Sequence, residues 1–89
     1  MNNKVIRVSS KSNSSAVAGA IAGLLKENSK IEIHAIGAGA LNQAIKAVAI
    51  ARGFVATSGV ELVCVPSFGL TIIDGEEKTS VKLLLREEK

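Results

Sequence analysis

Apolar residues recur with two alternating periods in the first half of the chain, and the alternation predicts two strand–helix units. A β-branched run at residues 5–8 predicts a strand that ends in the polar block 9–15. The apolar positions that follow, up to Asn28, return at the spacing of one helix face. Ser14 or Ser15 is the predicted N-cap of this helix.

The second unit repeats this order with a glycine-containing turn between the strand and the helix. Residues 31–36 predict the strand, residues 37–39 its exit turn, and residues 41–54 the helix. The resemblance between the two units is a weak internal repeat rather than a solenoid.

Side-chain size predicts which helix faces pack inward. A face of small side chains on the first helix predicts close approach to a neighbouring element, since each helical glycine costs about 1 kcal/mol. These small residues are Ala16, Gly19, Ala20 and Gly23. The predicted buried stripe of the second helix consists of Leu41, Ile45, Val48 and Val55, with Ala44, Ala47 and Ala51 beside it.

The last third of the chain predicts strands alone. Residues 60–66 are apolar nearly throughout, which is typical of a strand buried on both faces. Pro66 has no amide hydrogen for a strand ladder, so it predicts a bulge or the end of this strand. Residues 70–73, a turn at Asp74-Gly75 and a returning strand at 79–86 predict a β-hairpin.

The complete order is β-α-β-α-β-β, which predicts an α/β fold of the α+β two-layer type in a single domain over residues 1–89. We expect a mixed four-stranded sheet and two helices. Strand–helix–strand connections are right-handed in nearly every case, so the first two strands should be parallel. The loops 9–15 and 37–40 then leave the sheet at the same edge.

Length and cysteine content bear on the oligomeric state and the cellular location of the protein. A domain of 89 residues leaves much of its surface exposed, so a second chain that covers one face is expected. The single cysteine, Cys64, has no partner within the chain, which favours an intracellular protein. The sequence contains no segment typical of a leader or a membrane span, so we expect a cytoplasmic protein without membrane contact.

Charge and aromatic content bear on the partner. The net charge is +3, and basic residues outnumber acidic ones in residues 1–60, with no acid before Glu27. This asymmetry suits an anionic partner, although a surface that is basic by accident explains it about as well. The chain has two phenylalanines and no Trp or Tyr, which argues against modules that stack bases on a row of aromatic rings.

The two loops at the common edge carry the candidate binding residues. Serine hydroxyls, amides, lysine and the open amino ends of helices are the usual contacts to phosphate. A solvated loop and a solvated helix face are the alternatives. The candidate residues are Ser10, Lys11, Ser12, Asn13, Asn42, Gln43, Lys46 and Arg52.

Residues for catalysis or metal binding are scarce, and we predict no enzyme, cofactor or metal. His34 shares a strand side with Glu32, which favours a surface pair over a catalytic base. Cys64 stands in an apolar strand as a small buried side chain. The turn that begins at Gly37 resembles a dinucleotide fingerprint but has Asn42 where the third glycine belongs.

Two segments resemble the stage V sporulation protein S family. They are SAVAGAIAG at residues 15–23 and AIGAGALNQAIKAVAIARGFVA at residues 35–56. That family is similar in its order of elements to the Alba family of dimeric chromatin and RNA-binding proteins. The resemblance implies an Alba-like fold and a cytoplasmic homodimer that binds DNA or RNA in sporulation or developmental control, with Lys11 on the nucleic-acid backbone.

Two departures from the Alba pattern suggest weak or conditional binding. The turn after the second strand has the uncharged residues 38–40 where Alba-like proteins often have arginine, and the hairpin tip carries Asp74, Glu76 and Glu77. Two other functions remain open. One is a regulatory protein-interaction module that docks through the small-residue helix face or the apolar hairpin strand. The other is small-anion sensing at the paired helix amino ends.

Overall fold

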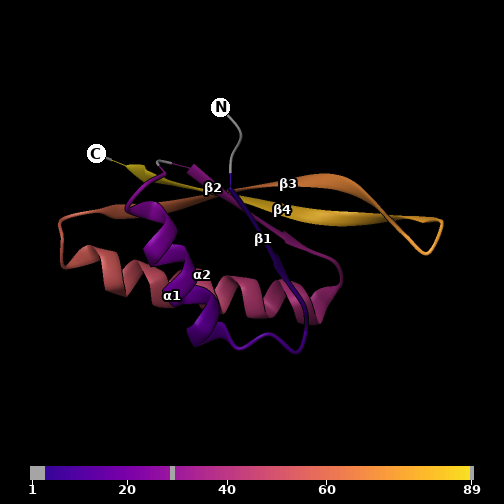
Figure 1. Ribbon diagram of the computed structural model, residues 1–89, viewed down its shortest axis with the longest axis horizontal. Coiled ribbons are helices and arrows are strands. Elements are labelled where there is room, and N and C mark those ends of the chain that lie inside the picture. Colours follow the sequence, from indigo (N-terminus) through magenta and orange to yellow (C-terminus); the bar gives the residue numbers. More distant parts are fainter. Residues whose placement is uncertain (1–3, 29, 89) are drawn as a thin grey trace.

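A computed structural model describes residues 4–28 and 30–88 and confirms the order β-α-β-α-β-β. Four strands form one sheet, and both helices lie against the same face of it (Figure 1). The α+β two-layer prediction is therefore confirmed. The elements are β1 (Lys4–Val8), α1 (Ser14–Leu25), β2 (Lys30–Ala35), α2 (Ala38–Ala56), β3 (Glu61–Ile73) and β4 (Glu76–Glu88).

The sheet is mixed, with strand order β1-β2-β4-β3. β1 and β2 are parallel, as predicted, and pair from Lys4 opposite Ile31 to Val8 opposite Ala35. β4 is antiparallel to both β2 and β3. The returning strand therefore lies between β2 and β3 and places β3 at the outer edge.

The core lies between the helices and one face of the two central strands. Ile31 and Ile33 of β2 pair with Leu85 and Leu83 of β4, and all four are buried. Ile21 of α1 packs into the same cluster. Strand alternation turns the intervening residues to the opposite face of the sheet, which neither helix covers (Figure 1).

The predicted inward face of α2 is confirmed at Val48 and at the alanines beside it, and it is wrong at Ile45. Ile45 is 47% exposed, whereas the buried positions of α2 are Ala40, Ala44, Ala47, Val48 and Ala51. The helix begins at Ala38, three residues before the predicted start, because Gly37 reaches the positive φ of 91° that turns the chain out of β2. Short side chains let α2 lie close to α1 and the sheet. Leu41 and Val55 still pack against the core, whereas Ile45 is exposed.

Two expectations for α1 were also wrong. Its N-cap is Asn13, since the Oδ1 atom of Asn13 accepts the Ala16 backbone N–H at 3.0 Å. The small-residue face does not pack closely, because a Cβ atom added at Gly19 or Gly23 would have no heavy atom within 4 Å. This face of α1 is exposed in the single chain.

Strand β3 differs most from its prediction. It runs without a break through Pro66, which pairs in register with Leu83. An edge strand tolerates proline because one side of its backbone needs no ladder partner. Val65 and Phe68 are exposed, so this strand is not buried on both faces.

The end of β3 and the beginning of β4 form an arm that projects beyond the sheet. The last pair between β2 and β4 is Ala35 with Val81, whereas β3 and β4 stay paired from residue 69 to residue 80 as a two-stranded ribbon, which we call the β-arm (Figure 1). Positive φ angles of 52° at Asp74 and 78° at Gly75 close its turn, as predicted.

One face of β3 is strongly apolar, both within the β-arm and at the residue directly before it. Alternate positions Phe68, Leu70 and Ile72 are 80%, 72% and 73% exposed. We call these three residues the arm stripe. A two-stranded ribbon is marginally stable in water without further packing, so the arm stripe is the part of the fold in greatest need of a partner surface.

The difference between the core isoleucines and the exposed isoleucine of α2 gives a stability test. We expect Ile33→Ala to lower the free energy of unfolding by about 2–5 kcal/mol, because it leaves a cavity under the helices. Ile45→Ala is the matched control, and we expect less than about 1 kcal/mol there. Urea unfolding followed by circular dichroism measures both, and equal losses would contradict the packing of α2.

Candidate nucleic-acid interface

The loop after β1 and the start of α2 lie side by side. The Nε2 atom of Gln43 donates to the backbone oxygen of Ser12 at 2.7 Å. A Cβ atom added at Gly39 would stand 2.9 Å from the Cβ atom of Ser10. The predicted common edge is confirmed, and we call residues 9–13 with residues 38–46 the loop edge.

Serine side chains shape the first loop from within. The backbone N–H of Ser9 donates to the Oγ atom of Ser12 at 2.9 Å, and the N–H of Lys11 donates to the Oγ atom of Ser9 at 3.2 Å. The Ser12 N–H also bonds the Ser9 carbonyl at 3.1 Å. These bonds hold a compact turn with Lys11 at its tip. Ser12 therefore stabilises the loop through its hydroxyl group and binds the neighbouring Gln43 through its backbone oxygen.

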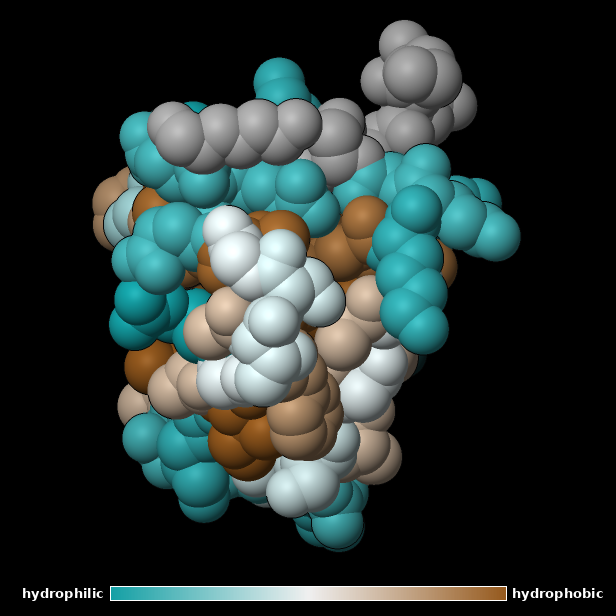
Figure 2. Space-filling model, turned by 90° about the vertical axis from the view of Figure 1, so that its left-hand side faces the viewer, coloured by the Kyte–Doolittle hydropathy of each residue, from teal (hydrophilic) through white to brown (hydrophobic). Residues whose placement is uncertain are grey.

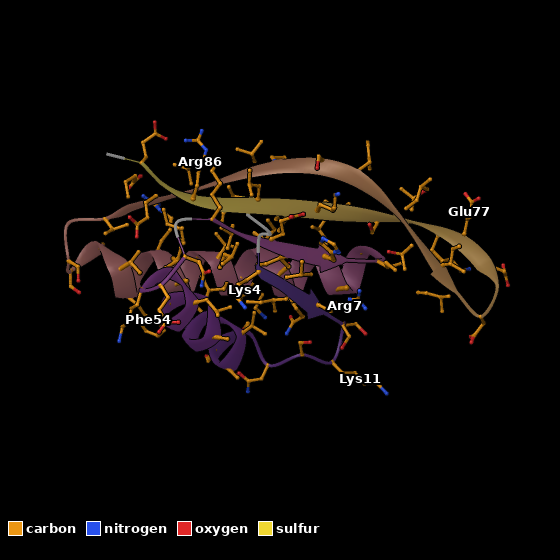
Figure 3. All side chains as sticks on the ribbon, turned by 45° about the horizontal axis from the view of Figure 1, so that its top comes forward. Lys4, Arg7, Lys11, Phe54, Glu77 and Arg86 are labelled. Carbon is orange, nitrogen blue, oxygen red and sulfur yellow. The ribbon has the colours of Figure 1, made fainter. Side chains whose placement is uncertain are left out.

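Lys11 and Lys46 supply the cationic groups of the loop edge. Lys11 is exposed and points away from the body of the protein (Figure 3), and no described residue forms an ion pair with it. The Nζ atom of Lys46 donates to the Oε1 atom of Gln43 at 3.3 Å. Gln43 therefore connects the Lys46 ammonium to the loop that carries Lys11.

The amino ends of the two helices differ in how they are capped. Asn13 uses its side-chain oxygen to cap α1. Gly37, at the N-cap of α2, has no side chain to offer, and no side-chain cap is present there. The first amides of α2 thus keep their positive character, which favours an anion. Asn42 is exposed in the second turn of the same helix.

The structure does not bring Arg52 to the loop edge. Arg52 follows Asn42 by nearly three turns of α2, which places it about 15 Å further along the axis. Its Nη2 atom donates to the Oε1 atom of Glu61 at 2.6 Å. This hydrogen bond and the charge of Glu61 raise the pKa of Arg52 above its usual value. Of the predicted residues, seven lie at the loop edge, and Arg52 is held elsewhere by a carboxylate.

A row of basic side chains on the uncovered sheet face was missed by the sequence analysis. Arg7 lies opposite His34, and His34 lies opposite Lys82, on three adjacent strands. The Nε2 atom of His34 is 3.3 Å from the Oε1 atom of Glu32, which confirms that these two residues share one side of β2. Strand alternation was the available signal, but the row forms only because β4 lies beside β2.

Gly69 belongs to the same face as this row. A Cβ atom added at Gly69 would stand 3.0 Å from the Cδ atom of Lys82 and 3.0 Å from the Oγ atom of Ser80. The stem of Lys82 therefore lies across the backbone of β3. Glycine at this position leaves room for the stem of Lys82.

The acidic residues of the hairpin lie at the far end of the β-arm, where Figure 3 labels Glu77. Glu76 is 3.8 Å from the Lys78 ammonium.

Cys64 is half-buried, and burial raises the pKa of its thiol. Within the described ranges, no three His, Cys, Asp or Glu side chains are grouped to hold a metal ion.

These features define a small two-layer α+β domain with one bare sheet face, a projecting β-arm and an acid-free loop edge. A family model described as Stage V sporulation protein S matches residues 4–88. The chain belongs to this family, which indicates a role in sporulation. The family is regulatory and is not a known enzyme family. Among the described residues, no helix is both long and apolar enough to cross a membrane.

The close contact between Gly39 and Ser10 gives a second stability test. Gly39→Ala places a methyl group against the loop, so we expect a loss of about 1–3 kcal/mol in the free energy of unfolding. Gly19→Ala is the matched control on an open helix face, and we expect it to stabilise by up to about 1 kcal/mol. Chemical denaturation measures both, and a stabilising Gly39→Ala would contradict the close packing of the loop edge.

Proposed function

We propose that this protein is a cytoplasmic regulator of sporulation that binds the backbone of DNA or RNA as a homodimer. The observation that carries the proposal is the loop edge, where Lys11, Lys46 and the open amino end of α2 come together. The single half-buried thiol of Cys64 suits a reducing compartment.

The electrostatics of the loop edge favour a polyanion. Neither residues 9–13 nor residues 38–46 include an aspartate or a glutamate. Lys11 has no carboxylate neighbour among the described residues, so its charge is available to a ligand. Lysine and helix amides contact phosphates without reading bases, and binding of this kind is largely independent of sequence.

The acidic hairpin tip limits where a nucleic acid can lie. Asp74, Glu76 and Glu77 surround the turn of the β-arm, and carboxylates there repel phosphates. We therefore place the contact at the loop edge and the adjoining basic row, with the tip of the β-arm outside it.

The arm stripe is the proposed surface for the second copy. Its three side chains are the most exposed large apolar residues of the described chain. Their burial against another arm stripe would remove a wide apolar area from water, at about 25 cal/mol for each Å² buried. A homodimer of this kind presents two loop edges to one nucleic acid, which raises the effective affinity of each.

A second candidate function is docking of a regulatory protein. Ala22, Leu25, Phe54 and Val55 line a groove at the carboxyl ends of the two helices. Figure 2 looks onto this end of the molecule, where apolar surface is framed by hydrophilic residues. Phe54 is 51% exposed there. A protein partner that bound here would leave the loop edge free.

The salt dependence of binding tests the proposed function. If a dimer neutralises about four to eight phosphates, log affinity should fall against log salt with a slope of about −4 to −7. Lys11→Gln and Lys46→Gln should each weaken binding to all sequences alike and reduce the slope by about one for each phosphate that is no longer neutralised. Fluorescence anisotropy with matched DNA and RNA measures this.

The matched control is Lys78→Gln, since Lys78 lies on the β-arm beside Glu76. We expect its affinity and slope to equal those of the unchanged protein. A slope near zero, or an equal loss in all three variants, would contradict a contact at the loop edge. Binding of a stable protein partner without any shift of nucleic acid at low salt would favour the docking function.

The proposed dimer has its own test. Phe68→Ser and Leu70→Ser should convert the protein to monomer in sedimentation equilibrium, because each removes apolar area from the arm stripe. Phe54→Ser is the control on the other exposed phenylalanine, and it should leave the dimer intact. A dimer that survives the arm substitutions and dissociates with Phe54→Ser would overturn this arrangement.

A further inference from the structure

A groove opens where the carboxyl ends of β1 and β2 meet the β-arm. It has a cavity volume of about 410 Å³, which falls within the size range of small-molecule sites. Its walls come from distant parts of the sequence, with Arg7 on β1, His34 on β2 and Ile73 on β3. Register pairs Arg7 directly with His34. The loop edge borders this groove, since Ser10 belongs to both.

One side of the groove is suited to a phosphate group. Arg7 has no ion-pair partner among the described residues. Its guanidinium offers paired N–H donors that match two oxygens of a phosphate. Ser9 and Ser10 stand at the same end, just after the last residue of β1. His34 lies beside Arg7, and its Nε2 atom is 3.3 Å from the carboxylate of Glu32.

The other side of the groove is aliphatic. Ile36 and Ile73 line it, and both side chains are exposed. Ile36 follows β2, whereas Ile73 lies at the end of β3. A cation at one end and branched aliphatic walls at the other favour a ligand that joins an anion to a flat, weakly polar group.

We propose that this groove binds a single nucleoside phosphate unit, with its phosphate on Arg7 and its base against Ile36 and Ile73. The unit has two possible sources, which are a free mononucleotide and an unpaired nucleotide of a bound nucleic acid. The second source rests on the proposed function, because the strand would continue from Ser10 onto the loop edge. The base is held between aliphatic side chains, so no aromatic platform is needed.

Nuclear magnetic resonance titration of the full chain tests this proposal. The probes are adenosine 5′-monophosphate, uridine 5′-monophosphate, inorganic phosphate and a short single-stranded oligonucleotide with a 5′-phosphate. We expect a mononucleotide or the oligonucleotide to shift the amide signals of Arg7, Ser10, Ile36 and Ile73. Inorganic phosphate should bind at least about tenfold more weakly, because it lacks the apolar contact.

Variants separate the two sides of the groove. Arg7→Gln should weaken nucleotide binding by about tenfold or more, since it removes the charge-assisted hydrogen bonds to phosphate. Ile73→Ser should weaken nucleotide binding and leave the weak response to inorganic phosphate unchanged. Lys4→Gln, an exposed cation on the same strand but outside the groove, is the matched control and should bind as the unchanged protein does.

Each remaining outcome either supports or overturns the proposal. An oligonucleotide response without a mononucleotide response supports the groove and assigns the unit to the nucleic-acid chain. Equal affinity for inorganic phosphate, or no response to any nucleotide probe, overturns the proposal even when a duplex shifts the signals of Lys11. A mononucleotide response together with no duplex binding supports the groove and instead contradicts the proposed function.

Discussion

The parallel pairing of β1 with β2 is the constraint on which the rest of the molecule depends. It brings the carboxyl ends of both strands to one edge of the sheet, so the serine-rich loop and the start of α2 must meet. Gly39 permits the close approach, and Gln43 then fixes the two segments by its 2.7 Å bond to Ser12. The position of Lys11 near the amino end of α2 is thus a consequence of the sheet topology.

The insertion of β4 between β2 and β3 organises the other surface. It aligns Arg7, His34 and Lys82 across the uncovered face, and it carries β3 outward until its end projects as the β-arm. The same arrangement creates the groove beside Arg7 and exposes the arm stripe. The loop edge is therefore charged, the groove beside Arg7 is partly basic and partly aliphatic, and the arm stripe is apolar. Each of these three surfaces suits a different kind of contact.

The order of elements and the common edge could be predicted from the sequence because hydrophobic period and connection handedness are local rules. The inward face of α2 was predictable except at Ile45, since Ile45 and Ala44 are both apolar and only the need for close packing selects alanine. The continuity of β3 through Pro66 depended on its edge position, which strand order alone determines. The row that contains Arg7 also depends on this strand order, so the sequence alone did not reveal it. The sequence also did not show that Arg52 binds Glu61 instead of lying at the loop edge.

Mapping of a bound duplex on the full chain by amide chemical shifts tests the central claim most directly. A duplex at low salt should shift the signals of residues 9–13 and 38–46 together, because one surface carries both segments. It should leave the signals near Phe54 and the hairpin tip unchanged. Shifts confined to the carboxyl ends of the helices, or shifts in only one of the two segments, would contradict the account.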